Sequence, residues 1–179
     1  MEKFKLVSPS KKYEKELNDF KKEVLKAGSN DMFAGCGDLG KMTVPEFIEY
    51  SKLLSKKETC PNDKVPANYY LMVRNEDDRL VGMIDLRHHI DHPILSLWGG
   101  HIGYSIRPSE QGKGYAKIML KLDLDKAREL GLKKVLVTCS DNNPRSERTI
   151  IACGGIFENK VIVDNETIER YWISLEETK

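Results

Sequence analysis

The stretch from Gln111 to Ala116 is the part of the sequence best suited to bind a charged ligand, and its members are Gln111, Gly112, Lys113, Gly114, Tyr115 and Ala116. An alternating run that ends at Ile106 precedes it, and a segment with helical spacing follows it, so glycines connect a predicted strand to a predicted helix. Unpaired backbone N–H groups and the positive end of the helix dipole attract phosphate at such a junction. The sequence therefore predicts a site for a phosphorylated ligand.

Two common phosphate-binding motifs do not fit this loop. A dinucleotide fingerprint needs a third glycine at position 117, where the chain has Lys117, and a Walker A loop needs four residues between its glycines. Gly112 and Gly114 still matter, because a side chain would block close approach of the backbone or penalise a turn with positive φ. The loop alone is a weak signal for any one ligand.

The elements that must position this loop alternate between strands and helices. Thr43 and Glu46 have the spacing of a capping box, Gly28 and Gly131 can end helices, and Asn143 with Pro144 can begin one. The stretch 28–42, which contains Asp31 and Asp38, is rich in Gly, Asn and Asp and is predicted to be a loop. The predicted strands are 4–7, 69–73, 80–86, 100–106, 134–139, 156–163 and 167–175, and the predicted helices are 13–27, the segment after Thr43, 114–130 and the segment after Asn143.

Composition narrows the class of protein. The 29 basic and 28 acidic residues nearly cancel, so no strong field draws the chain to nucleic acid or to a membrane surface. With 179 residues we expect a single domain, residues 1–179. The charged N-terminal stretch has no apolar core of a secretory signal and no run is long enough to span a bilayer, which favours a cytoplasmic location.

The four cysteines form no C-x-x-C pair, so we expect no metal site and four free thiols; they are Cys36, Cys60, Cys139 and Cys153.

The loop also resembles the pyrophosphate loop of the GNAT superfamily of N-acetyltransferases, because Gln111, Gly114 and Ala116 match its pattern of Gln or Arg, two residues, Gly, one residue, and Gly or Ala. The resemblance extends from about Leu80 through Gly154, and the order of predicted elements is that of the family. It is nearest to uncharacterised bacterial acetyltransferases. It implies an α/β (α+β) fold with a central, mixed, mostly antiparallel twisted sheet of about seven strands and about four flanking helices.

The resemblance further implies that acetyl-CoA is the cosubstrate and that the strands at 100–106 and 134–138 splay apart around its pantetheine arm. Backbone groups of Ser105, Ile106 and Arg107 would bind that arm, and the amides of Gln111 to Ala116 would bind the pyrophosphate. Asn143 and Ser146 would line the other side. Each residue also has a simpler interpretation: Asn143 as a helix cap, Ser146 as a first-turn residue, and Lys113 as a solvated charge.

The catalytic residues are less well determined. His101 is the first candidate for a general base and His88 or His89 the second, because the ordinary pKa of histidine lies near neutral pH. Strand alternation, however, puts His101 on the face opposite Tyr104. Many GNAT members have a tyrosine as general acid where this chain has Ile150. Tyr104, Tyr171 or water would have to replace it, with Tyr104 favoured because it shares a strand face with Ile106.

The acceptor is not determined by the sequence. We expect a primary amine on a small molecule or a protein, with polyamines, aminoglycosides and amino acids all open, and either a monomer or a homodimer. Asp31 and Asp38 are acidic loop residues that would attract a cationic amine. Two alternative functions share the loop: a non-catalytic acyl-CoA sensor, favoured by Ile150, and a regulatory domain that binds ATP or NAD.

Overall fold

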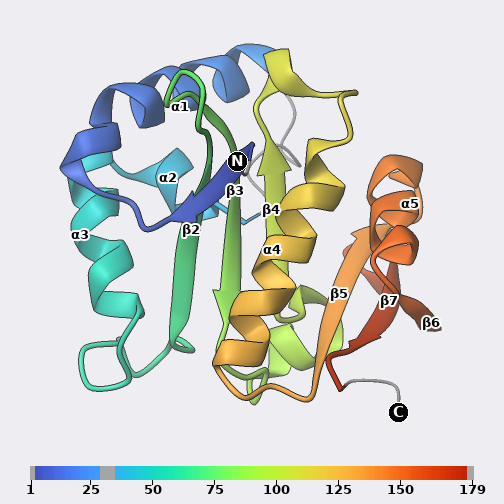
Figure 1. The fold of residues 1–179 in the computed structure, drawn as a ribbon. Coiled ribbons are helices and arrows are strands. Elements are labelled where there is room, and N and C mark those ends of the chain that lie inside the picture. Colours follow the sequence, from blue (N-terminus) through green and yellow to red (C-terminus); the bar gives the residue numbers. More distant parts are fainter. Residues whose placement is uncertain (1–2, 29–34, 177–179) are drawn as a thin grey trace.

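The strands form one seven-stranded sheet in the order β1-β2-β3-β4-β5-β7-β6 (Figure 1), seen in a computed structural model that describes residues 3–28 and 35–176. Neighbouring strands are antiparallel except β4 and β5, which are parallel. The sheet is therefore mixed and mostly antiparallel, as predicted. The strands are β1 (Phe4–Val7), β2 (Ala67–Arg74), β3 (Leu80–Arg87), β4 (Ile102–Ile106), β5 (Lys134–Ser140), β6 (Ile156–Val163) and β7 (Glu166–Ser174).

Helices cover both faces of the sheet, with α4 crossing in front of β3 and β4 in Figure 1 and α5 lying beside β5 and β7. The α-helices are α1 (Glu14–Ala27), α2 (Gly37–Lys41), α3 (Val44–Leu54), α4 (Tyr115–Glu129) and α5 (Pro144–Ala152). Shorter turns are η1 (Lys11–Tyr13), η3 (Leu95–Gly99, a π-helical turn) and η4 (Pro108–Glu110). The prediction of a loop over 28–42 was incomplete, because α2 forms inside it; Asp31 lies outside the described residues.

The helix ends follow the local chemistry of the sequence. The Thr43 hydroxyl accepts from the Glu46 amide at 3.4 Å, and the Glu46 carboxylate accepts from the Thr43 amide at 2.8 Å. These two bonds complete the predicted capping box at the start of α3. Gly28 ends α1 with φ of 71°, a left-handed conformation that costs glycine nothing.

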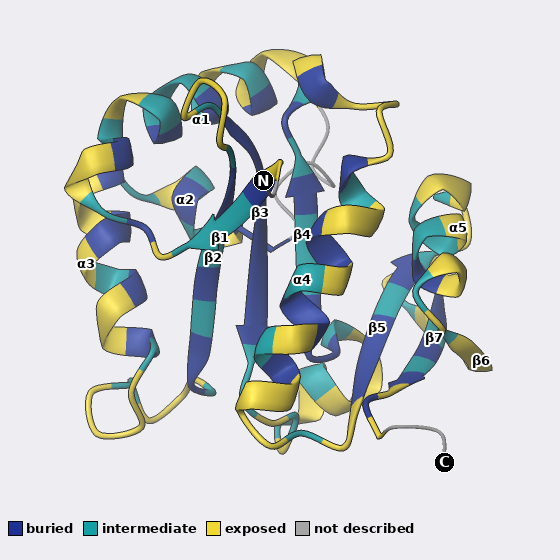
Figure 2. Cartoon of the chain, viewed as in Figure 1, coloured by how far each residue is buried: buried dark blue, intermediate teal, exposed yellow. Residues whose placement is uncertain are grey.

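Two hydrophobic layers lie on opposite faces of the sheet. Leu17, Phe20 and Phe47 from α1 and α3 pack on one face, and Met119 and Ile150 from α4 and α5 belong to the layer on the other. Figure 2 shows β3 buried along nearly its whole length, because both layers cover it. This double burial fixes β3 and, through it, the neighbouring β4 that carries the candidate site.

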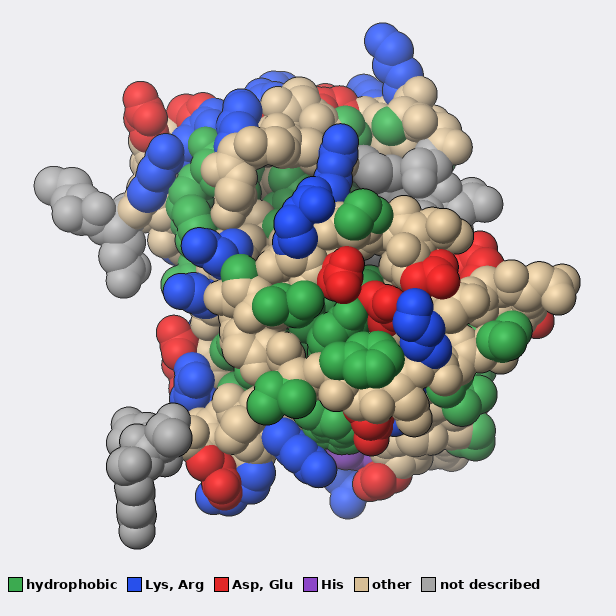
Figure 3. Space-filling model, turned by 90° about the vertical axis from the view of Figure 1, so that its right-hand side faces the viewer, with side chains coloured by type: hydrophobic (Ala, Val, Ile, Leu, Met, Phe, Trp, Pro, Cys, Tyr) green, Lys and Arg blue, Asp and Glu red, His purple; other side chains and the backbone are tan. Residues whose placement is uncertain are grey.

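Strand β6 forms an exposed edge of the sheet. Ile156, Phe157 and Ile162 of β6 are exposed, and hydrophobic side chains gather on this side of the molecule in Figure 3. Asp164 and Asn165 connect β6 to β7 with φ of 49° and 67°, as a tight hairpin requires. Because β6 adds little to either layer, β5 and β7 position the candidate site from this side.

Other findings concern thiols and membrane segments. All four cysteines are free, as predicted, with Cys36 and Cys139 buried. Within the described ranges, every helix falls short of the length and hydrophobicity that a bilayer crossing requires.

Candidate active site

The site is built where β4 and β5 part. Between these two strands the ladder has one register pair, Ile102 with Val137, beside a hydrogen bond from the His101 amide to the Leu136 carbonyl (2.7 Å). Beyond that point β4 remains paired with β3, and β5 remains paired with β7. A cavity of about 920 Å³ lies at the divergence, lined by residues from β4, β5, α4 and α5. Its volume lies in the range of pockets for small molecules and cofactors.

The glycine loop closes one end of this cavity. Gly112 and Gly114 both have φ of 77°, and a Cβ added to either would meet no atom within 4 Å. Glycine is needed here for its backbone conformation, and the space beside it is open. Gly114 is also the N-cap residue of α4, whose first amides have no acceptor within the helix. Loop and helix start together present N–H groups and a positive dipole end to the cavity.

The opposite wall comes from the start of α5. The Asn143 side chain accepts a hydrogen bond from the Ser146 amide (3.1 Å), so Asn143 is the helix cap that its alternative interpretation predicted. Both residues nevertheless line the cavity. Capping and lining are compatible because the first turn of α5 faces the cavity.

Four cationic residues on the cavity wall were not predicted, and one of them, Arg87 on β3, is paired with Asp85 at 2.8 Å. Arg145 and Arg148 on α5 and Lys117 on α4 line the cavity. The signal available in the sequence was the spacing of Arg145 and Arg148, three apart, which places them on one helix face. They give the cavity the positive charge that an anionic ligand requires.

Tyr104 reaches from β4 to α5. Its hydroxyl oxygen lies 2.7 Å from Ser146 Oγ, and both residues line the cavity. Burial raises the pKa of Tyr104 to about 12, and the hydrogen bond with Ser146 opposes that rise only in part. The phenol is therefore protonated at neutral pH and available as a proton donor.

His101 lies away from the cavity and is held in the sheet. Its Nδ1 accepts a hydrogen bond from the Leu136 amide (2.9 Å), and its ring packs against Trp172 with centroids 6.2 Å apart. Burial, with a contribution from the charge of Arg87, lowers the pKa of His101 to about 4. The structure therefore makes His101 a neutral link between β4 and β5 and does not bring it to the cavity.

The second histidine candidates are also outside the cavity lining. Nε2 of His88 donates to Asn68 Oδ1 at 2.6 Å, and burial lowers the pKa of His88. Nδ1 of His89 lies 3.4 Å from Asp91 in an exposed loop. In the described part of the chain, the cavity lining contains no histidine.

Comparison with known proteins decides the family. A family model for the acetyltransferase (GNAT) domain matches residues 43–156, more than half of the chain. The chain belongs to the GNAT acetyltransferase family. It is accordingly an N-acetyltransferase by family. A comparison with curated proteins finds no match.

Solved GNAT structures share the fold across nearly the whole chain. A chimera of the spermidine N-acetyltransferase SpeG from Vibrio cholerae and hSSAT has 18% identity and a TM-score of 0.65, covering 97% of this chain and 96% of that one. The microcin self-immunity acetyltransferase MccE, solved with acetyl-CoA and AMP, has 18% identity and a TM-score of 0.68, covering 97% and 93%. At this level of identity, the likeness establishes a common fold.

Ile150, where the resemblance implies a tyrosine, lies on α5. It is fully buried among the residues that α5 packs against the sheet, while Thr149 lines the cavity beside it. Tyr171, the other tyrosine considered, donates its hydroxyl proton to Glu169 (2.8 Å) and does not line the cavity. Of the two tyrosines, Tyr104 alone reaches the site.

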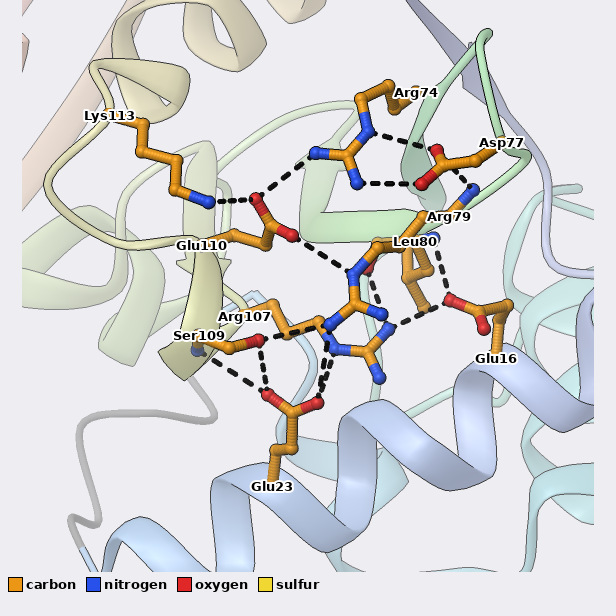
Figure 4. Close-up of polar contacts among 10 residues, drawn as sticks. All are labelled: Glu16, Glu23, Arg74, Asp77, Arg79, Leu80, Arg107, Ser109, Glu110 and Lys113. Atoms are coloured by element: carbon orange, nitrogen blue, oxygen red, sulfur yellow. Dashed lines mark hydrogen bonds and ion pairs between the residues drawn. The ribbon is translucent and has the colours of Figure 1, made fainter.

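Two predicted GNAT cofactor residues, Arg107 and Lys113, have side chains engaged in ion pairs (Figure 4). Arg107 is buried, donates to Glu16 at 2.8 Å and Glu23 at 2.7 Å, and does not line the cavity. The amide of Arg107 bonds the Val81 carbonyl at 2.9 Å, so this backbone group is engaged in the sheet. Lys113 Nζ lies 2.8 Å from Glu110 Oε2, so Lys113 is paired rather than simply solvated.

The structure thus brings most of the predicted site together. His101, Arg107 and Lys113 do not line the cavity. The predicted residues that do line it are Tyr104, Ser105, Ile106, Gln111, Gly112, Gly114, Tyr115, Ala116, Asn143 and Ser146.

Proposed function

We propose that this protein transfers an acetyl group from acetyl-CoA to a primary amine, by direct attack of the amine in a ternary complex. The observation that carries the proposal is that the parted strands β4 and β5 and the glycine loop line one cavity. A phosphate-binding loop alone would suit many nucleotides. Parted strands add an extended slot, and strand backbone along its edges suits the amides of a pantetheine arm.

In this proposal the parts of acetyl-CoA lie along the cavity in order. The Gln111 amide bonds the Pro108 carbonyl at 3.4 Å, so the amides from Gly112 to Ala116 would hold the pyrophosphate. Arg145, Arg148 and Lys117 would supply positive charge for the phosphates. Backbone groups of Ser105 and Ile106 would bind the pantetheine arm. The thioester would then lie between β4 and β5, near Tyr104.

Tyr104 is the proposed general acid. The amine nitrogen attacks the thioester carbonyl carbon, the carbon–sulfur bond breaks, and the sulfur leaves with the bonding electrons. Tyr104 gives its proton to that sulfur and regains one from solvent, with Ser146 at 2.7 Å as the adjacent hydroxyl. A backbone amide near Ile106 would stabilise the oxyanion, because fixed dipoles need no reorganisation.

The amine must lose a proton before or during the attack. Neither His101 nor His88 lines the cavity, but Glu166 does, at the start of β7. We therefore add Glu166 to the candidates for the base, with water as its alternative. The acceptor itself is a small-molecule or protein amine in this proposal. Because SpeG is a spermidine N-acetyltransferase of the same fold, spermidine is one amine to test first.

Two measurements test the proposal. Calorimetry with acetyl-CoA, CoA, ATP and NAD should show binding of the two CoA ligands in preference to the two nucleotides; equal or tighter ATP binding would remove its basis. CoA release should then be followed with a panel of amines that includes spermidine. Isoleucine at position 150, where the resemblance implies a tyrosine, favours one alternative, an acyl-CoA sensor. Such a sensor would bind acetyl-CoA but accelerate its loss with no amine.

A further inference from the structure

Glu110 is a buried carboxylate directly before the glycine loop. It is 4% exposed, lies in the turn η4, and lines the cavity. Its oxygens contact Lys113 at 2.8 Å, Arg79 at 3.0 Å and Arg74 at 3.3 Å (Figure 4). A carboxylate beside a phosphate site repels the ligand, so its presence there needs a reason.

The cations around Glu110 come from different parts of the fold. Arg74 and Arg79 flank the turn between β2 and β3, and Lys113 stands between the two glycines of the loop. Glu110 therefore joins the phosphate loop to a fixed hairpin. Burial opposes ionisation of Glu110, but the hydrogen bond from Lys113 and the charges of Arg74 and Arg79 outweigh it, so the pKa of Glu110 lies below its ordinary value.

Helix α1 holds the other end of the same turn. The Glu23 carboxylate accepts from the Ser109 hydroxyl at 2.7 Å and from the Ser109 amide at 3.4 Å. It also accepts from Arg107 Nε at 2.7 Å. The segment between β4 and α4 is thus tied to α1 on one side and to the β2–β3 hairpin on the other.

The charges in this network balance. Arg74, Arg79, Arg107 and Lys113 face Glu16, Glu23, Asp77 and Glu110 (Figure 4). Lys113 is the member on the glycine loop itself, and its side chain is 48% exposed. It can turn toward a phosphate while Glu110 keeps its contacts with Arg74 and Arg79.

We propose that Glu110 is a positioning residue for the cofactor. It holds the glycine loop in its binding shape and keeps Lys113 beside Glu110, outside the cavity lining, from where Lys113 moves to the pyrophosphate of acetyl-CoA. This inference rests on the proposed function, because it takes CoA as the ligand. It concerns binding and not the chemical step, since Glu110 acts through the loop and Lys113.

The direction in which Glu110→Gln changes the Kd for CoA distinguishes a positioning role from simple electrostatic repulsion. Glu110→Gln removes a negative charge beside an anionic ligand, so electrostatics alone predicts tighter CoA binding. Positioning predicts the opposite, a Kd for CoA raised roughly tenfold or more, the typical worth of a charge-assisted contact. Calorimetry with free CoA gives this sign, and unchanged or tighter binding by folded Glu110→Gln would overturn the proposal.

Kinetics and a matched control exclude a merely structural effect. The KM for acetyl-CoA should rise in Glu110→Gln while kcat stays within a few fold. Asp77→Asn removes another anion of the same network, but Asp77 contacts Arg74 away from the loop and is half exposed, so its Kd for CoA should not change. A raised Kd in Asp77→Asn as large as that in Glu110→Gln would contradict a specific role for Glu110.

Two more variants complete the test. In a Lys113→Met background, Glu110→Gln should have a smaller effect on the Kd, because part of its action passes through Lys113; an undiminished effect would overturn that route. If Glu110→Gln does not fold, Glu110→Asp carries the test, since it keeps the charge but withdraws the carboxylate from Arg79 and Lys113. Failure of the proposed function would give a different result from failure of this inference, because the unaltered protein itself would not bind CoA.

Discussion

The hydroxyl oxygens of Tyr104 on β4 and Ser146 on α5 lie 2.7 Å apart, which connects the two walls of the cavity by one hydrogen bond. Ser146 is in the first turn of α5, whose cap is Asn143, so the position of the phenol depends on how that helix begins. A rigid phenol at this place suits proton transfer to a departing thiolate. Its role can be measured separately from its packing.

Replacing Tyr104 by Phe removes the proposed acid and keeps the ring. We expect kcat to fall by ~10² or more with little change in acetyl-CoA affinity, because general acid catalysis is worth about that factor. Steady-state kinetics with an identified acceptor measures this. Ile150→Val serves as the control and should leave kcat within a few fold, since residue 150 is buried in the core. A kcat for Tyr104→Phe within about threefold of the parent would contradict the assignment.

Gly114→Glu should abolish CoA binding in a protein that still folds. The substitution puts bulk and negative charge where the pyrophosphate is expected. Because Gly114 has φ of 77°, a residue with a side chain there lowers the stability of the protein by about 1 kcal/mol. Gly131→Glu is the matched control, because Gly131 follows the other end of α4 with φ of 79° and equally open surroundings. Calorimetry should show normal CoA binding for Gly131→Glu. Normal binding by folded Gly114→Glu would show that the loop is not the phosphate site.

His101→Gln should lower stability and leave the chemistry intact. The folded-state pKa, about 4, is below the ordinary value of 6.5, so the unfolded chain binds more protons between these values. The stabilising effect of neutral His101 is complete above pH 6.5 and is lost as the pH falls toward 4. Denaturant unfolding of both proteins at several pH values measures this. A loss of kcat by ~10² in folded His101→Gln would instead support a role as general base.

Asp123→Asn should stabilise the protein at neutral pH. Asp123 is fully buried on α4, and neither carboxylate oxygen has a hydrogen-bond partner among the described residues. Burial raises the pKa of Asp123 well above its ordinary value, and the charge of Asp85 adds to the rise. As the pH rises, the Asp123 carboxyl ionises in the unfolded chain before it ionises in the native protein. The free energy of unfolding therefore falls from about pH 4 upward, until Asp123 ionises in the native protein as well.

Thermal unfolding across that range checks the role of Asp123. The asparagine variant should gain roughly 1 to 3 kcal/mol near pH 8 relative to the parent, and the gain should shrink toward pH 4. A gain that does not depend on pH would mean that ionisation of Asp123 is not its cause.

Local chemistry made most of the fold predictable. The capping box of Thr43 and Glu46, the end of α1 at Gly28 and the cap at Asn143 involve neighbours in the sequence, so their spacing identifies them. The sequence did not predict helix α2, because two of its five residues are glycines, which have low helix propensity. Burial of Leu39 stabilises this helix in place of intrinsic propensity.

The parts of the site formed by local backbone conformation were predictable from the sequence. The parts formed by side chains from distant positions were less predictable. Gly112 and Gly114 predict backbone with positive φ from their residue type, because glycine adopts that conformation without a steric penalty. The contacts of Glu110 with Arg74 and Arg79 join residues more than thirty positions apart, which no local pattern reveals. His101 has the right chemistry for a base, and only its burial beside Leu136 shows that it is held elsewhere.

The parting of β4 and β5 divides the sheet into a block of four strands, β1 to β4, and a block of three, β5 to β7. Backbone hydrogen bonds run through each block but scarcely between them. A ligand whose amides lie in the slot continues the ladder from one block to the next, much as an inserted strand would. In the proposed complex, acetyl-CoA would therefore be a mechanical part of the molecule: it would resist independent opening of the two blocks, and its departure would restore their freedom to move.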